Sequence, residues 1–537
     1  MNSSSSALYR EYLQHRCLHL SPEDFSTAFD SALSQISTFD CAEPETAVEL
    51  NDFGVMALIE ADQADDLSMK ELYFQTALEA FQSGARVGGY PLCNAHLAIM
   101  EKMVGDRSAS GQSAYTGLIQ SFLQSNPSAP HPPLGLIYLP RKTGIGAIET
   151  GEILHAVYQA RNGLEQATLI LAATLCDANL AFYTPNGLRT LHLLGHLTLQ
   201  SSILKMRLGI ASFYQNQLEG LHYLHQAHTL NPNNVAVLQT LFLACLDIGS
   251  RDVAERWLMH TQQMLMQTNS NSPEWYWVNQ QSLESSFTYV PFDGLQLAVE
   301  SSLNSIVTSV VLAQGDWFED ELTFWRHHLQ PGMVVIDVGA NVGIYTFSAA
   351  KQVGSTGKVF AVEPFSACVH RLQETRRVNQ LDWVHICPGA ASNRSGKARL
   401  GLDKASELNQ IIADDANPSV QFEEVQCFTL DELVEKEQLT RLDWLKIDAE
   451  GHEIQVLEGS HSLLTQFRPN ILYENIAGAI HKTNLPVAEF LIKNEYVLYT
   501  YQPYFDYLIP LGSLENLKGK LNIIAIHQSR VNDFSQR

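Results

Sequence analysis

The sequence predicts a multidomain protein, in which an α-helical array is followed by a Rossmann-like α/β domain with a mostly parallel seven-stranded sheet and an antiparallel edge. Apolar residues recur at helical spacing through almost all of residues 8–283. From Asp316 onward, strand patterns alternate with helix patterns, which is typical of a parallel sheet covered by helices on both faces. At 537 residues the chain is also longer than one ordinary domain. We expect a helical domain over 1–268, a linker over 269–285 and an α/β domain over 286–530.

Composition and charge narrow the class of protein. The hydrophobic fraction of 45% is that of a soluble globular protein, and the formal net charge of −24 disfavours nucleic acid or an anionic membrane as partner. The 8 cysteines are scattered and none forms C-x-x-C, which predicts free thiols rather than a zinc site or redox pair. The sequence contains no transmembrane-length apolar run, and its N-terminal serine run is unlike a secretory signal. We therefore expect a cytoplasmic protein without membrane insertion.

Within the helical part, one stretch carries a repeat signal. Residues 204–264 resemble a tetratricopeptide repeat (TPR) array, and the resemblance weakens before them. For 1–200 a non-repeating helical bundle is nearly as well supported. Proline-rich 126–140 predicts a loop, and 268–273 has the composition of a linker. The spacing of the second helix of such a repeat and its closing proline is shared by Gly220, Leu224, Ala227 and Pro232.

The elements of the α/β part follow in order. Asp293-Gly294 between two apolar runs predicts a hairpin. The last two strands have no helix between them, so we expect them to pair as an antiparallel edge. Helices are expected at Asp316–Leu329, after Gly343, and at Phe365–Asn379 and Glu450–Leu464. Strands are expected at 287–290, 296–299, 334–338, 358–363, 383–387, 425–428, 442–448, 470–474, 497–501 and 521–526.

A glycine loop follows the strand at 334–338. Gly339 suits a tight turn, and Gly343 suits a helix that starts close to a ligand, where unpaired N–H groups would bind a carboxylate. A dinucleotide fingerprint would need glycine at Asn341 and Ile344, and a P-loop would need Gly-Lys-Ser/Thr, so neither is predicted. The pattern D-x-G-x-x-x-G, which starts at Asp337, instead resembles the first motif of class I S-adenosylmethionine (SAM) methyltransferases. An ordinary strand-to-helix turn is the alternative.

Four of the predicted strands end in an acid. Glu363 lies about twenty residues past the glycine loop, where an acid hydrogen-bonds ribose hydroxyls in folds of this kind. Asp337, Asp448 and Glu474 end three other strands. Because ligands of parallel sheets bind at the carboxyl ends of the strands, we expect these four acids to lie around one ligand. For Glu363 a solvated strand end is the alternative.

With these residues placed, the C-terminal part resembles the FkbM family of methyltransferases, over roughly 316–527. Its marks are Ile336–Gly343, Val362–Pro364, Thr429–Leu433 and, most specifically, Lys446–Glu453. The resemblance implies a class I methyltransferase fold, SAM as cofactor and O-methylation of a sugar or natural product. The cofactor-binding positions that it implies in this chain are Asp337, Gly339, Asn341, Gly343, Glu363 and Pro364.

Methyl transfer to a hydroxyl needs in-line alignment, exclusion of water and removal of a proton. We favour Asp448 as the base or acceptor-orienting residue, because its strand is expected beside the glycine-loop strand. Glu450 and Glu474 are the other catalytic candidates, although Glu450 could instead cap the next helix. The same capping role applies to Glu453, and we expect His452 to be a solvated helix residue. We predict no metal, although this acid spacing leaves magnesium open.

Two classes of function stay open. The leading one is a SAM-dependent O-methyltransferase acting on a glycan or secondary metabolite, whose helical part recruits the acceptor or a protein partner. The alternative is a protein-binding TPR scaffold with an inert SAM-binding fold. A nucleic-acid methyltransferase is disfavoured by the acidic charge. In the aromatic stretch 502–520, the rings of Tyr504, Phe505 and Tyr507 either stack on a sugar or belong to an edge loop, and the edge loop is preferred.

Overall fold

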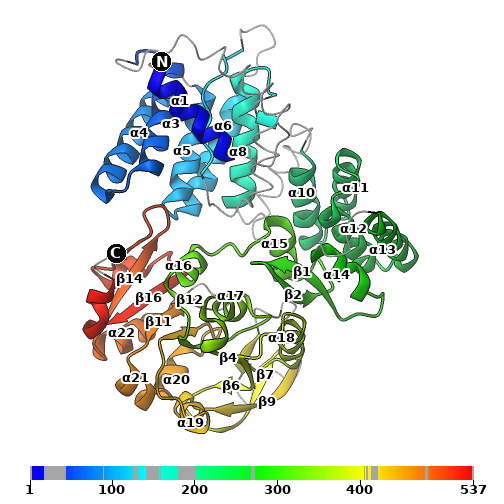
Figure 1. The fold of residues 1–537 in the computed structure, drawn as a ribbon, viewed down its shortest axis with the longest axis vertical. Coiled ribbons are helices and arrows are strands. Elements are labelled where there is room, and N and C mark those ends of the chain that lie inside the picture. Colours follow the sequence, from blue (N-terminus) through cyan, green and yellow to red (C-terminus); the bar gives the residue numbers. More distant parts are fainter. Residues whose placement is uncertain are drawn as a thin grey trace. The chain divides into compact units, whose positions relative to one another are not determined.

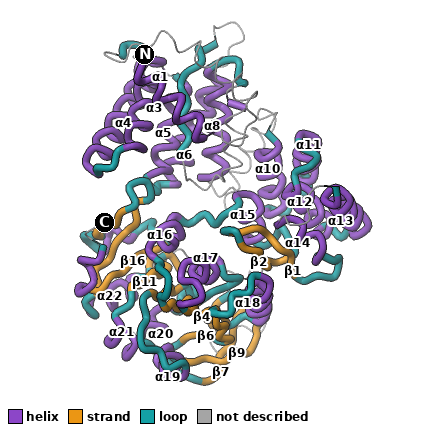
Figure 2. The backbone as a smooth tube through the Cα atoms, viewed as in Figure 1, coloured by secondary structure: helices purple, strands orange, loops and turns teal. Residues whose placement is uncertain are grey.

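The structure is a computed structural model that separates a mainly helical part from a part built on strands (Figures 1 and 2). Among the residues that it describes, no helix is long and apolar enough to cross a membrane. The described residues are 3–16, 44–88, 90–124, 131–140, 156–157, 159–178, 201–267, 273–403, 406, 409–412, 421–477 and 482–534.

The chain divides into two compact units. The helical unit comprises Met1–Thr268 with two short later segments, Ser302–Asn304 and Leu312–Asp316. The α/β unit comprises Asn269–Ser301, Ser305–Val311 and Trp317–Arg537.

Helices of the helical unit pack mainly with their neighbours in sequence, α3 with α4, α5 with α6, α10 with α11 and α12 with α13. Thr46 and Glu49 form a capping box at the start of α3. A Cβ at Gly54 would lie 2.7 Å from the Phe81 ring, so glycine permits the close approach of α3 and α4. The helices are α1 (Ser3–Arg16), α3 (Ala47–Gln63), α4 (Leu67–Gly88), α5 (Pro91–Met103), α6 (Arg107–Gln124), α8 (Gly163–Ala178), α10 (Ser202–Tyr214), α11 (Gly220–Leu230), α12 (Val235–Asp247) and α13 (Arg251–Met266).

The region with the repeat signal forms two helix hairpins, α10–α11 and α12–α13. Gly220 lies where α10 and α11 approach, since a Cβ there would be 2.6 Å from the Gly209 carbonyl oxygen. Leu224 and Ala227 are buried, and Pro232 follows the end of α11. The TPR class itself stays a prediction.

The α/β unit contains the remaining elements, and α15 has residues in both units. Its helices are α14 (Pro273–Gln280), α15 (Ile306–Gln314), α16 (Asp320–His328), α17 (Ile344–Val353), α18 (Ser366–Val378), α19 (Leu430–Lys436), α20 (Glu453–Glu458), α21 (His461–Phe467) and α22 (Leu485–Lys493). Its strands are β1 (Phe287–Phe292), β2 (Leu295–Glu300), β3 (Val334–Val338), β4 (Lys358–Glu363), β5 (Val384–Pro388), β6 (Ala390–Ala391), β7 (Gly396–Gly401), β8 (Gln410–Ile412), β9 (Phe422–Phe428), β10 (Trp444–Ile447), β11 (Asn470–Glu474), β12 (Ile476–Ala477), β13 (Lys482–Thr483), β14 (Tyr496–Gln502), β15 (Tyr507–Pro510) and β16 (Asn522–His527).

The predicted hairpin is confirmed, because β1 and β2 pair antiparallel across Asp293 and Gly294, which both have positive φ. It packs on α18, where the Ala298 N–H donates to Thr375 Oγ1 at 2.9 Å. Helix α14, within the stretch expected as a linker, packs on β1.

The main sheet has eight strands in the order β15-β14-β16-β11-β10-β3-β4-β5, so the predicted count of seven is wrong. Strands β5, β4, β3, β10 and β11 pair in parallel. The last two predicted strands do pair antiparallel, as β14 and β16, but β16 lies inside the sheet between β11 and β14. The edge strand on the antiparallel side is β15, in the aromatic stretch, where four residues with a terminal proline carry a weak strand signal.

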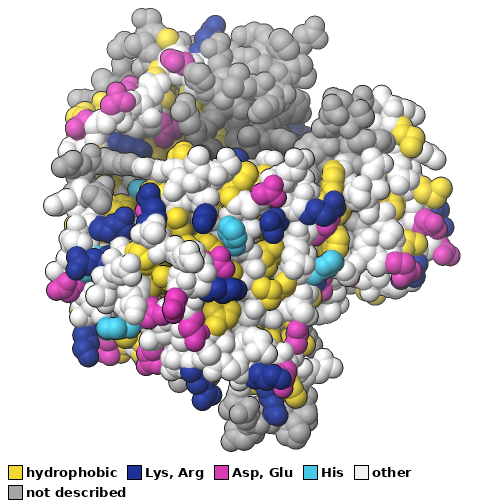
Figure 3. Space-filling view, turned by 60° about the horizontal axis from the view of Figure 1, so that its bottom comes forward, with side chains coloured by type: hydrophobic (Ala, Val, Ile, Leu, Met, Phe, Trp, Pro, Cys, Tyr) yellow, Lys and Arg dark blue, Asp and Glu magenta, His cyan; other side chains and the backbone are white. Residues whose placement is uncertain are grey.

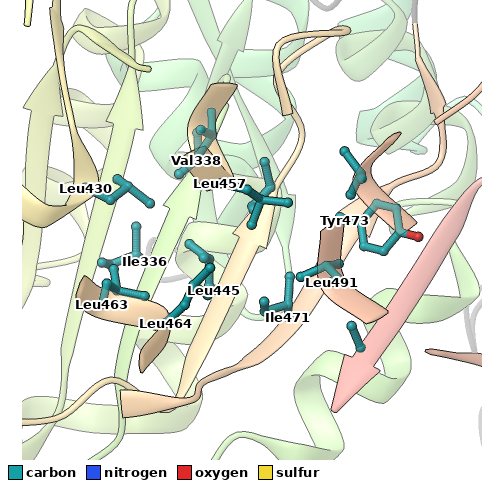
Figure 4. Close-up of a cluster of buried hydrophobic side chains, with 14 of the residues drawn as sticks. Ile336, Val338, Leu430, Leu445, Leu457, Leu463, Leu464, Ile471, Tyr473 and Leu491 are labelled. Atoms are coloured by element: carbon teal, nitrogen blue, oxygen red, sulfur yellow. The ribbon is translucent and has the colours of Figure 1, made fainter. Parts of the chain in front are cut away.

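Successive residues of these strands face opposite sides of the sheet. On one side, residues such as Ile336, Leu445 and Ile471 pack with leucines of α20, α21 and α22 in a buried apolar cluster (Figure 4). Helices α17 and α18 pack on strands β3 to β5. Asp337 and Lys446 alternate with the apolar cluster residues and are partners in the β3–β10 register. These two charges therefore lie on the face opposite the cluster.

Strand β9 exists as predicted but belongs to a second sheet, in the order β6-β9-β7-β8. The bounds of two helices also differ from those predicted. Helix α16 begins at Asp320 rather than Asp316, and the helix expected over 450–464 is divided into α20 and α21. Glu450 has φ of 49°, which no helical residue adopts, and the division falls at Gly459, where a Cβ would be 2.0 Å from the Ser392 carbonyl oxygen.

Candidate active site

The structure brings the four strand-end acids to one edge of the main sheet. Glu363 and Glu474 are the last residues of β4 and β11, Asp448 directly follows β10, and Asp337 is the penultimate residue of β3. These four strands are neighbours in the order β11-β10-β3-β4 and run parallel. Their carboxyl ends therefore share one edge.

Gly339 makes the tightest contact of the glycine loop. Its φ is +76°, and a Cβ would lie 1.6 Å from the carbonyl oxygen of Asp448. Gly343, the N-cap of α17, has φ of +101°, and a Cβ there would meet the Phe347 ring at 2.3 Å. Gly339 is thus required by the approach of β3 to β10, and Gly343 by packing within the protein rather than by a ligand.

Amide groups of the loop already have acceptors within the protein. Gly339 and Ala340 donate to the Val362 carbonyl at 3.0 and 3.1 Å, and Val342 donates to Asn341 Oδ1 at 2.7 Å. These three N–H groups are therefore not available to a ligand. The unpaired N–H groups predicted from the sequence belong to the first turn of α17, which would have to supply the donors.

Glu363 ties β4 to the glycine loop. Its Oε2 accepts the Asn341 N–H at 2.7 Å and its Oε1 accepts the Phe365 N–H at 2.8 Å, across Pro364. Burial raises the pKa of Glu363 to about 7, although both N–H donors lower it. A carboxylate oxygen has a second lone pair, so these bonds leave room for hydroxyl donors.

Asp337 is buried beneath α17, with an exposed fraction of 1%. Its Oδ2 accepts the Thr346 hydroxyl at 2.6 Å, which fixes the first turns of α17. Its Oδ1 is buried and has no hydrogen-bond partner among the described residues. Burial raises the pKa of Asp337, while Lys446 and Thr346 oppose the shift. The loop-supporting role expected for this residue is present, and one acceptor atom is left over.

Lys446 contributes to the site in a way that the sequence analysis did not predict. Its ammonium is nearly inaccessible and donates to Asp448 Oδ2 at 2.8 Å. Burial acts to lower the pKa of Lys446, but the carboxylates of Asp448, Asp337 and Glu319 together raise it, so the ammonium stays charged. Its strand position was the available signal, because a lysine between apolar residues of a buried strand needs a charged partner.

Three distant residues complete the surroundings of Lys446. The Tyr345 ring lies 4.5 Å from the ammonium, and its hydroxyl donates to Glu319 Oε2 at 2.5 Å. Asn522 Nδ2 donates to the same oxygen at 3.0 Å. No local sequence pattern links these residues, so their meeting could not be predicted.

Asp448, Glu450 and Glu474 gather at the site, each with one oxygen within 4.8 Å of those of the others. Burial and the neighbouring carboxylates raise the pKa of Glu474, and its buried Oε2 has no partner among the described residues. Such a group can hold a divalent cation through oxygen ligands. The prediction of no metal stays a prediction.

Glu453 and His452 have structural partners. Glu453 Oε1 accepts the N–H groups of Ala449 and Gly451, and its Oε2 accepts Asn484 Nδ2 at 2.8 Å. His452, expected to be solvated, is partly buried, and its Nε2 lies 3.0 Å from Ser392 Oγ. These contacts hold the turn before α20.

In the aromatic stretch, Phe505 stacks on Tyr507 with ring centroids 5.7 Å apart, and Tyr504 packs edge-on against Phe505. Asp506 accepts the Tyr501 hydroxyl at 2.6 Å and lies 3.1 Å from His327 Nδ1. The preferred expectation, an edge segment attached to the sheet, matches the position of β15.

Comparison with known proteins adds a family match. A search of curated proteins finds no match. Residues 337–497 match the model of the methyltransferase FkbM domain. This range contains all four strand-end acids and the glycine loop.

Comparison with solved structures returns several methyltransferases, all at low TM-scores. One is a methyltransferase FkbM from Methylobacillus flagellatus, with 12% identity, coverage of 41% of this chain and 54% of that chain, and a TM-score of 0.25. An O-methyltransferase from Bacillus cereus in complex with SAH has 14% identity, coverage of 39% and 78%, and a TM-score of 0.23. A SAM-dependent O-methyltransferase from Thermotoga maritima has 16% identity, coverage of 39% and 66%, and a TM-score of 0.21. This chain thus spans about half the length of the first of these proteins.

Because these TM-scores are too low to support an argument, the domain is identified from the family match alone. The chain therefore contains a methyltransferase FkbM domain, at residues 337–497.

Proposed function

We propose that the α/β unit is a SAM-dependent methyltransferase that transfers a methyl group to a hydroxyl of a glycan or secondary metabolite. The FkbM match over 337–497 supports methyl transfer. The observation that carries the proposal is the pairing of Asp448 with the buried ammonium of Lys446, directly beside Gly339. This arrangement supplies an oriented carboxylate at the edge where ligands of parallel sheets bind.

SAM, when bound, supplies an electrophilic methyl group on a sulfonium. Glu363 would accept the ribose hydroxyls, using the lone pairs that its two backbone N–H bonds leave over. Asp337 Oδ1, buried without a partner among the described residues, would accept from the amino group. Gly339, Asn341 and Gly343 would shape the loop, with Pro364 beside Glu363.

The acceptor hydroxyl needs a group that orients it and takes its proton. We assign this role to Asp448, because Lys446 holds the carboxylate in place by a 2.8 Å ion pair. Glu474 and Glu450 lie close enough to contact the same acceptor. Burial and the neighbouring carboxylates raise the pKa of Glu474, which favours the protonated form, and a protonated carboxyl donates a hydrogen bond rather than acting as a base.

Comparative mass spectrometry of glycans and small metabolites would test the proposal and identify the acceptor. We expect a strain lacking the gene to contain a species lighter by one methyl group, which the wild-type gene restores and Asp448→Asn does not. Unchanged methylation across both classes of compound would contradict the proposed acceptor chemistry.

The alternative is a scaffold whose SAM fold is inert. The observation that favours it is that backbone N–H groups of the glycine loop already have acceptors within the protein. Glu363 and the Val362 carbonyl accept these N–H groups. An inert fold would bind no SAM, whereas the enzyme binds it without an acceptor.

For the helical unit we propose recruitment of the acceptor or of a partner protein, and a cytoplasmic setting. Nucleic acid is not among the proposed partners. On the face in view, basic and acidic side chains are interspersed rather than gathered in one basic area (Figure 3), and the net charge of the chain is −24.

A further inference from the structure

Residues 131–140, which we call the inner segment, lie in the proline-rich stretch predicted as a loop. They form no helix or strand, as predicted, yet residues 135–140 are buried. Loops normally run over the surface because their backbone N–H and C=O groups need partners. A buried irregular segment must obtain those partners from side chains.

The helices of the helical unit provide these partners. Five consecutive N–H groups of the inner segment donate to side chains from four helices, α8, α3, α1 and α5. Tyr9 and Tyr12 each act twice, since their hydroxyls also donate to the carbonyls of Ile137 and Leu139. The five bonds are Gly135 N to Gln166 Oε1 at 3.1 Å, Leu136 N to Asp52 Oδ1 at 2.7 Å, Ile137 N to the Tyr9 hydroxyl at 3.1 Å, Tyr138 N to His96 Nε2 at 3.0 Å and Leu139 N to the Tyr12 hydroxyl at 2.7 Å.

Hydrogen bonds among the buried side chains of His96, Asn51 and Asp52 orient them toward the inner segment. His96 Nε2 accepts the Tyr138 N–H, so Nδ1 carries the proton and donates to Asn51 Oδ1 at 2.9 Å. Asn51 Nδ2 then donates both to Asp52 Oδ1 and to the Leu136 carbonyl, each at 3.0 Å. Asn51, Asp52 and His96 therefore all form hydrogen bonds to main-chain atoms of the inner segment.

Side chains of the inner segment add selectivity. A Cβ at Gly135 would lie 2.8 Å from the Tyr90 hydroxyl and 2.9 Å from Asn51 Nδ2, so glycine is required there. The Tyr138 ring stacks on Tyr12 at 5.8 Å, and its hydroxyl lies 3.0 Å from both carboxylate oxygens of Asp62.

Main-chain hydrogen bonds for affinity and side-chain contacts for selectivity are the features by which proteins bind extended peptides. We propose that α1, α3, α5 and α8 form a binding site for an extended peptide with glycine followed by aliphatic and aromatic residues, and that the inner segment occupies this site. A partner of the same chemistry must displace the inner segment. The proposal is independent of methyl transfer, because every residue in it belongs to the helical unit.

A full-length variant with an emptied site tests the proposal. In it, Leu136→Gly, Ile137→Ser, Tyr138→Gly and Leu139→Ser are combined, and the probe is a fluorescein-labelled peptide with the sequence of residues 131–140. We expect saturable binding to the variant and at least tenfold weaker binding to the wild type. In the wild type the inner segment competes at the millimolar effective concentration of a tethered ligand.

Matched controls locate the binding. Adding Asn51→Ala to the emptied variant should weaken binding at least tenfold, because Asn51 bonds the main chain and orients His96. Adding Asn94→Ala should leave binding unchanged, since among the described residues Asn94 Nδ2 donates to Gln120 Oε1 and to no atom of the inner segment. A probe peptide with valine in place of Gly135 should bind at least tenfold more weakly.

If the emptied variant does not fold, thermal melting decides instead. Excess peptide should then restore a cooperative transition, because a ligand of the folded state stabilises it. The proposal is overturned if the peptide neither binds nor stabilises the variant, if wild type and variant bind equally, or if the two asparagine controls behave alike.

Discussion

Among single residues, Lys446 matters most for the electrostatics of the site, because its buried ammonium forms an ion pair with one of the acids. It donates to Asp448 and stands opposite Asp337 in the strand register. Glu474 forms no ion pair among the described residues, and burial, Asp448 and Glu450 raise its pKa, although Lys446 opposes the shift. The two acids therefore differ in whether a cation is paired with them, which favours separate roles.

The first prediction contrasts Asp448→Asn with Glu474→Gln. Asp448→Asn removes the base and should lower kcat by about 10²–10⁴ while changing SAM affinity little. Glu474→Gln replaces a carboxyl whose raised pKa favours the neutral form, and it should change kcat less than about fivefold. Steady-state kinetics checks both, and an equal loss of kcat in the two variants would refute the separate roles.

The second prediction concerns pH and Glu363, whose pKa is about 7 without ligand. Ribose hydroxyls donate better to the ionised form, so SAM binding should release a proton below pH 7. Affinity should therefore rise by up to about tenfold from pH 6 to pH 8. Calorimetry of wild type and Glu363→Gln would check this. The variant should bind more weakly and lose this component, and an identical pH dependence in both would exclude Glu363 from the site.

Helices and strands could be predicted from the sequence where they depend on neighbouring residues, but not where they depend on contacts between distant parts of the chain. The β3–loop–α17 unit could be predicted because strand, glycines and helix follow one another in the chain. The position of β16 between β11 and β14 could not, since it depends on pairings between distant strands. The interior position of 135–140 was also missed, because proline and glycine indicate an irregular segment but not its burial.

The third prediction tests the contact of β3 with β10 through Gly339. Gly339→Ala would place a Cβ 1.6 Å from the Asp448 carbonyl oxygen and should cost more than about 3 kcal/mol of unfolding free energy. Gly332→Ala is the control, because Gly332 also has positive φ but its nearest contact would be 3.7 Å. It should cost only about 1–2 kcal/mol. Chemical denaturation would compare them, and equal costs would contradict the close approach.

The fourth prediction concerns the pH stability of the helical unit. Burial raises the pKa of Asp52 to about 7 and lowers that of His96 to about 3. Between about pH 4 and pH 6.5 the folded unit holds one proton on Asp52, and the unfolded chain holds one on His96. The pair then binds equal numbers of protons in both states, so its contribution to stability is flat.

Asp52→Asn removes this compensation. His96 alone, with a depressed folded pKa, stabilises the fold above pH 6.5 and loses that effect as the pH falls. The variant should lose about 1.4 kcal/mol per pH unit relative to wild type between pH 6 and pH 4. Denaturation at several pH values would check this, and parallel stability curves would show that the pair is not coupled to folding.

At the scale of the whole molecule, two compact units divide the proposed work. The glycine loop and the strand-end acids belong to the α/β unit, and the inner segment with its main-chain partners belongs to the helical unit. Helical repeats can offer an extended surface to partners. The inner segment occupies the peptide site proposed for α1, α3, α5 and α8, so recruitment by the helical unit would use another surface or displace this segment.

Titration of the full-length chain with SAM by calorimetry would show whether the α/β unit binds the cofactor. We expect saturable binding at one site without any acceptor, weakened about tenfold or more in Glu363→Gln through the loss of charge-assisted hydrogen bonds. Gly332→Ala, away from the strand-end acids, should bind as the wild type does. The absence of binding to the folded wild-type chain would contradict the proposed methyltransferase function and leave the α/β unit as an inert fold.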